Sequence, residues 1–70
     1  MREYTVPLRW RGNAQVEAMR DFVRIATDSQ LQSEWRRIQA LSTWQTVDVV
    51  CCDLVERALT HRGLEPDSWW

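Results

Sequence analysis

The sequence contains no lysine, only two glycines and two prolines, a single histidine and no long apolar run. With two glycines the chain has little scope for a backbone loop that cradles phosphate. Its longest apolar stretch, Val49-Val50-Cys51-Cys52, is far too short to cross a bilayer. The first ten residues, MREYTVPLRW, lack the apolar core of a signal peptide. We therefore expect a cytoplasmic protein that does not associate with membranes.

The two cysteines, Cys51 and Cys52, are adjacent rather than spaced. Disulfide frameworks and zinc sites both need spaced cysteines. His61 lies nine or ten residues away, roughly 14 Å along a straight helix, so it cannot act as a base for either thiol. We interpret both cysteines as small buried hydrophobic residues in a reducing compartment.

Paired carboxylates occur at Asp53 and Glu56, where the helical pattern places them on a polar, solvated face. An acid–base pair would need a raised pKa, and no apolar surroundings are predicted there. We therefore expect a non-enzymatic protein without catalytic residues, metal or cofactor. The least favoured class is an enzyme whose site a partner chain would complete.

The formal net charge is −1, and all nine cationic side chains are arginine. Residues 1–40 hold seven arginines against five acidic residues, whereas residues 41–70 hold two against five. A near-neutral chain has no general attraction to nucleic acid or to an anionic membrane. The five tryptophans are the unusual feature, because a core this small accommodates about two or three of them.

An alternating pattern near the start predicts a β-strand with one buried face. Its apolar side consists of Tyr4, Val6, Leu8 and Trp10. Pro7 lies on the other side and cannot donate to a ladder, so the strand is expected at a sheet edge or in a two-stranded ribbon. Gly12 and Asn13 end it.

Helical spacing of apolar residues predicts three helices after this strand. The first covers residues 14–27, the second ends near Leu41, and the third ends near Arg62. Candidate N-caps precede them: Asn13; Asp28 or Ser29, the latter in a capping box with Gln32; and Ser42, in a capping box with Gln45.

The third predicted helix is the longest, and its apolar arc covers roughly 200° of the helical wheel. It is therefore either the central element of a monomer or the seam of a dimer. Gly63 should end it in a left-handed conformation, with Leu64 packing back on Leu59, and Pro66 prevents its continuation.

The predicted fold class is mainly α, in detail a small α+β domain with one strand followed by three helices, the third longest and most buried. One domain is expected over residues 1–70. Its parts are a strand and turn over 1–12, a three-helix body over 13–63 and an aromatic tail over 64–70.

The tail ends in EPDSWW, which raises the question of what two adjacent tryptophans do after a helix stop. Trp10, Trp35 and Trp44 each fit an apolar pattern, so we expect them in the interior. Trp69 and Trp70 fit none, and they either fold back on the core, over the second helix, or anchor a partner protein.

The favoured function is a protein-binding module: a small inhibitor, adaptor or accessory subunit of a larger complex, as in inhibitors encoded by phages or plasmids. The predicted partner contacts are Trp69, Trp70, Arg36 and Arg37, because tryptophan and arginine are enriched among interface hot spots. The acidic residues Glu65 and Asp67 suit a partner pocket rimmed by cations. If the third helix is the seam of a dimer, the partner is a second copy of this chain.

The alternative is nucleic-acid binding. TVPLRW, then an amphipathic helix, then LQSEW resembles the strand–helix–helix order of ribbon-helix-helix repressors over residues 1–41. That resemblance implies a dimer whose paired strands enter the major groove, with Thr5, Arg9 and Arg11 as the DNA contacts. The chain departs from the family in Pro7, in a long third helix and in a near-neutral charge, which weakens phosphate binding.

Overall fold

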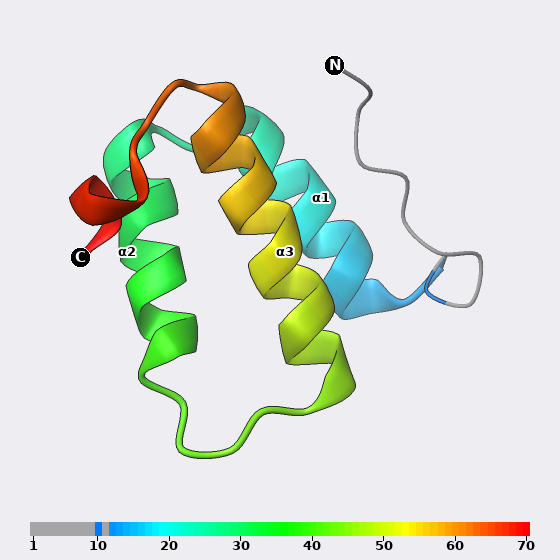
Figure 1. Ribbon diagram of the computed structural model, residues 1–70. Coiled ribbons are helices and arrows are strands. Elements are labelled where there is room, and N and C mark those ends of the chain that lie inside the picture. The colour runs from blue at the N-terminus through cyan, green and yellow to red at the C-terminus, as the bar shows by residue number, and fades with distance from the viewer. Residues whose placement is uncertain (1–9, 11) are drawn as a thin grey trace.

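A computed structural model describes Trp10 and residues 12–70. The described part contains three α-helices and one short 3-10 helix: α1 (Ala14–Ile25), α2 (Asp28–Gln39), α3 (Thr46–His61) and η2 (Pro66–Trp69). Helix α3 packs against both α1 and α2, and η2 lies beside α2 (Figure 1). The predicted mainly helical fold with a longest third helix is confirmed. The described residues contain no strand, and the predicted strand lies outside them except for its last residue, Trp10.

Helix α1 begins where the sequence predicts. The Asn13 side-chain oxygen accepts hydrogen bonds from the backbone N–H groups of Gln15 and Val16, at 3.0 and 3.2 Å. The helix ends at Ile25 rather than at residue 27, because Ala26 is already extended, with φ −68° and ψ 148°. Asn13 thus satisfies two N–H groups that have no partner within the helix.

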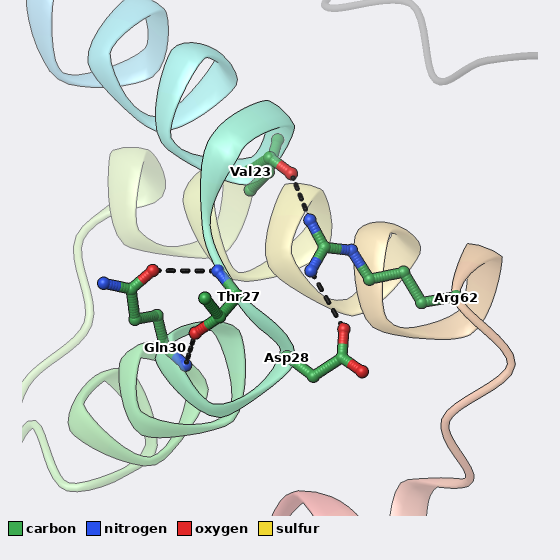
Figure 2. Close-up of polar contacts among 5 residues, drawn as sticks. All are labelled: Val23, Thr27, Asp28, Gln30 and Arg62. Atoms are coloured by element: carbon green, nitrogen blue, oxygen red, sulfur yellow. Dashed lines mark hydrogen bonds and ion pairs between the residues drawn. The ribbon is translucent and has the colours of Figure 1, made fainter.

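Helix α2 is capped by Thr27, so the prediction of Asp28 or Ser29 as its cap is wrong. The Thr27 hydroxyl accepts from the Gln30 N–H at 3.1 Å, and the Gln30 side-chain oxygen accepts from the Thr27 N–H at 2.8 Å (Figure 2). This reciprocal capping box starts α2 two residues earlier than a box built on Ser29 would. It also leaves the side chain of Gln32 free for a contact elsewhere.

Helix α3 starts at Thr46, and the predicted capping box of Ser42 with Gln45 is likewise wrong. Gln45 is the N-cap residue, and its backbone N–H donates to the Asp48 carboxylate at 2.8 Å. A carboxylate in the first helical turn also interacts favourably with the positive end of the helix dipole.

The predicted end of α3 is confirmed. Gly63 has φ 79°, the Leu64 N–H donates to the Leu59 carbonyl at 3.1 Å, and the Gly63 N–H donates to the Thr60 carbonyl at 2.9 Å. These two bonds define a Schellman motif. Leu64 packs against the same apolar cluster that contains Leu59.

The apolar arc of α3 is covered on two sides within one chain. One cluster joins α3 to α2 and η2; its central members are Trp35, Val55, Leu59 and Trp69. A second joins α3 to α1; its buried members are Val16, Val50, Cys51 and Leu54. Six of the 16 residues of α3 are buried. Helix α3 is therefore the central helix of the described part, while its predicted role as the seam of a dimer stays a prediction.

Arg62 connects the end of α3 to the turn between α1 and α2 (Figure 2). One terminal nitrogen of its guanidinium lies 2.9 Å from the Asp28 carboxylate, and the other donates to the Val23 carbonyl at 3.4 Å. That carbonyl lies in the last turn of α1, where carbonyls lack partners within the helix. The contact places the start of the tail near the start of α2. None of the helices in the described part is long and apolar enough to cross a membrane.

Candidate functional site: an exposed aromatic surface on α2 and η2

The two terminal tryptophans have opposite environments. Trp69 is 6% exposed and belongs to the cluster between α2 and α3, whereas Trp70 is 74% exposed. The Trp69 ring meets the Trp35 ring at a centroid distance of 5.5 Å and an interplanar angle of 67°, and its indole N–H donates to the Leu64 carbonyl at 3.3 Å. The prediction that the tail folds back on the core, over α2, is therefore confirmed for Trp69. Trp70 does not enter the core.

Trp70 is nevertheless held in place. Its ring lies edge-to-face against Trp35, with centroids 4.6 Å apart and an interplanar angle of 83°, a geometry that aromatic pairs favour. Trp35 itself is 6% exposed, and its indole N–H donates to the Glu56 carboxylate at 3.0 Å. Trp70 therefore rests on a fixed support while most of its surface faces solvent.

The tail runs along α2 from the helix start towards its middle (Figure 1). Arg62 binds Asp28 in the first turn of α2, and the Gln32 side-chain amide donates to the Ser68 carbonyl at 2.9 Å. The Ser68 hydroxyl closes the local turn by donating to the Glu65 carbonyl at 2.7 Å. These contacts fix the direction of the residues that lead to Trp70.

Arg36 lies one helical turn beyond Gln32 on α2. Its side chain is exposed, and its Nε donates to the Gln32 carbonyl at 3.2 Å. It forms no ion pair with any residue in the part of the chain that the structure describes. Its two terminal nitrogens are therefore available to a carboxylate from another molecule, for which a guanidinium is well shaped.

Arg37 differs from its neighbour. Its Nε donates to both oxygens of Glu34, at 3.0 and 3.1 Å, and a terminal nitrogen also binds one of them. The hydrogen bond to Glu34 raises the pKa of Arg37, with further contributions of the same sign from nearby acidic groups. Adjacent helical residues point about 100° apart, and Arg37 lines the shallow depression beside Phe22 of α1. Arg36 and Arg37 therefore do not form one site.

The prediction that Trp44 is interior is wrong, because 38% of its surface is exposed. Trp44 precedes the N-cap Gln45, so it lies outside the helix whose spacing suggested a buried position. Trp10, by contrast, is partly buried and packs against the cluster between α1 and α3.

Cys51 and Cys52 are free thiols, and both are buried. Burial raises the pKa of the Cys52 thiol to about 11 and also raises that of Cys51. Reactive cysteines need the thiolate form, so neither has the environment of a nucleophile. Among the described residues, no group of three or more histidine, cysteine or carboxylate side chains is arranged to hold a metal ion.

The remaining candidate groups are exposed or engaged in contacts with other side chains. His61 is exposed at the end of α3, Asp53 pairs with Arg57 at 3.0 Å, and Glu56 accepts from Trp35. The last of these contacts spans 21 residues in sequence, which is why sequence patterns did not reveal it.

The proposed DNA contacts Thr5, Arg9 and Arg11 lie outside the described residues, so the ribbon-helix-helix hypothesis stays a prediction. No protein-family model, curated protein or solved structure matches this chain.

Proposed function

We propose that this protein is a non-enzymatic protein-binding module, acting as a small inhibitor, adaptor or accessory subunit of a larger complex. The observation that carries the proposal is Trp70, which is 74% exposed and yet packs edge-to-face on the buried Trp35. Arg36 is the second contact, because it lies on the α2 surface next to the tail with a free guanidinium edge.

Trp70 meets the physical requirements of an interface anchor. An indole ring buries a large area when a partner covers it, and tryptophan is the residue type most enriched among hot spots. The support from Trp35 restricts the ring before binding, so less side-chain freedom is lost on association. The indole N–H of Trp70 makes no hydrogen bond with a described residue, so it can donate to a partner.

Of the four contacts predicted from the sequence, we keep Trp70 and Arg36 and leave out Trp69 and Arg37. Trp69 supports the fold from inside, and the charge of Arg37 is neutralised by Glu34. Removing residues 68–70 together would take Trp69 out of the core and would mix unfolding with loss of binding. Single substitutions at Trp70 and Arg36 separate these effects.

The proposal is tested by comparative affinity capture from lysate of the cells that encode the protein, with folding of each bait checked by circular dichroism. A partner should be retained by the unmodified chain and lost with Trp70→Ala, at a reduction of about thirtyfold or more in affinity. Arg36→Ala should weaken retention less.

Two matched controls accompany this experiment. Arg37→Ala removes a neighbouring arginine from the same helix, and Trp44→Ala removes another exposed tryptophan. Both should retain the partner. If Trp70→Ala captures the same proteins in the same amounts as the unmodified chain, the proposal is wrong.

A further inference from the structure

Charged residues occur in the tail before Trp70 and on α2 beyond the contact that holds the tail. Glu65 and Asp67 come before the Gln32–Ser68 contact, on the side of the Arg62–Asp28 pair that starts the tail. Both are exposed, and neither side chain is ion-paired with a described residue. The part of the tail before Ser68 therefore carries two carboxylates that have no ion-pair partner among the described residues.

Arg36 on α2 carries the opposite charge. Arg36 binds the Gln32 carbonyl through Nε, one helical turn beyond the residue that holds Ser68. Its guanidinium keeps its terminal nitrogens free of ion pairs within the described part of the chain. Trp35, which supports Trp70, lies between Gln32 and Arg36 in the sequence of α2. Trp70 therefore supplies an apolar contact between the tail and Arg36.

We infer that the partner presents a peptide segment in which an apolar side chain stands between a basic residue and an acidic one. The apolar side chain covers Trp70, the basic residue faces Glu65 and Asp67, and the acidic residue pairs with Arg36. Charge complementarity of this kind sets partner choice and orientation more than it sets affinity. This inference rests on the proposed function and adds to it the chemistry of the ligand.

A peptide suits this surface better than a nucleic acid does. Single-stranded nucleic acids also bind through exposed aromatic rings and arginines, but they need a positively charged groove that follows the phosphates. Here the guanidinium of Arg36 is outnumbered by the exposed carboxylates of Glu65 and Asp67. Residues 41–70 also carry three more acidic than basic side chains. A polyanion would be repelled at the Glu65 end.

The experiment selects random peptides displayed on phage against the immobilised full chain and sequences the bound pool. Peptides selected on the unmodified protein should be enriched at least about threefold, over the input, for an acidic and a basic residue on opposite sides of an apolar one. On Arg36→Glu the acidic preference should change to a basic one. The control Arg37→Glu carries the same charge change on the adjacent residue and should leave the preference unaltered.

The outcomes separate this inference from the proposed function. If bound peptides depend on Trp70 but show no charge order, or keep the acidic preference on Arg36→Glu, the inference is wrong and the anchor role of Trp70 stands. If the selection yields no peptide that Trp70→Ala fails to bind, both are wrong. Binding of a fluorescent oligothymidylate that requires Trp70 would also overturn both, in favour of a nucleic-acid ligand.

Discussion

Trp69 and Trp70 both pack against Trp35, but their environments differ. Trp69 is 6% exposed, meets Trp35 in a cluster with residues of α3, and has its N–H satisfied by Leu64. Trp70 meets the same ring from outside and remains 74% exposed. One residue lies inside the fold, and the next keeps most of its surface in solvent.

This difference separates the residue that we propose as a partner contact from the residues that form the core. A domain of this size buries a limited apolar area, so each large buried side chain carries a large share of its stability. Trp69 fixes the tail, and the fixed tail positions Trp70. Substitutions at the two residues and at their shared support should therefore have graded and separable effects.

The largest expected effect follows from Trp69→Ala. Truncating a buried tryptophan removes its apolar contacts and leaves a cavity, which lowers the free energy of unfolding by about 3–5 kcal/mol. That is comparable to the whole stability of a small domain. Urea denaturation followed by circular dichroism measures the loss.

Trp69→Phe provides the matched control because it keeps an aromatic ring while removing the hydrogen bond to Leu64. Its loss should be smaller, about 1–2 kcal/mol. A loss below about 1 kcal/mol for Trp69→Ala would mean that the tail is not part of the core. Trp69 and Trp70 would then contribute equally little to stability.

An intermediate effect is expected from Trp35→Phe, which acts on both environments at once. A smaller aromatic ring remains, but the partly buried hydrogen bond to the Glu56 carboxylate is lost, at about 1–2 kcal/mol of stability. Because Trp70 rests on this ring, selected peptides should also bind more weakly to the variant.

A double-mutant cycle with Glu56→Ala tests the cause of that loss. If the hydrogen bond accounts for it, the effects of the two substitutions should be strongly non-additive. Glu56→Gln is the conservative control, because its amide oxygen can still accept from the indole N–H. Additive effects would show that Trp35→Phe acts through packing alone.

The parts of the fold that sequence reasoning predicted are those determined by local periodicity and by a single special residue. Gly63 marks the end of α3 because only a glycine adopts φ 79° without strain, and Asn13 marks the start of α1 because its short side chain reaches the first free N–H groups. The wide apolar arc of α3 correctly indicated a central helix.

The sequence did not predict the N-cap of α2, where several residues of similar type are adjacent, or the contacts between residues far apart in the chain. Thr27, Asp28 and Ser29 can all cap a helix, and the reciprocal hydrogen bonds with Gln30 distinguish Thr27 from the other two. The Arg62–Asp28 pair joins residues 34 apart, and no local pattern indicates it.

The tail required tertiary information for the same reason. Sequence reasoning placed both terminal tryptophans among the candidate contacts, but only the packing against Trp35 distinguishes the buried one from the exposed one. Arg36 and Arg37 are likewise equivalent in sequence, and the position of Glu34 relative to Arg37 separates them.

The smallest effect on stability is expected from Trp70→Ala. Its ring packs edge-to-face on Trp35, and such a pair contributes about 0.5–1.5 kcal/mol when buried, so at 74% exposure the loss should stay below about 1 kcal/mol. Urea denaturation should therefore barely distinguish this variant from the parent, while peptide binding is lost. A loss as large as that of Trp69→Ala would place Trp70 in the same folding unit as Trp69. The exposed ring would then be a structural element, and its role as an anchor would lose its support.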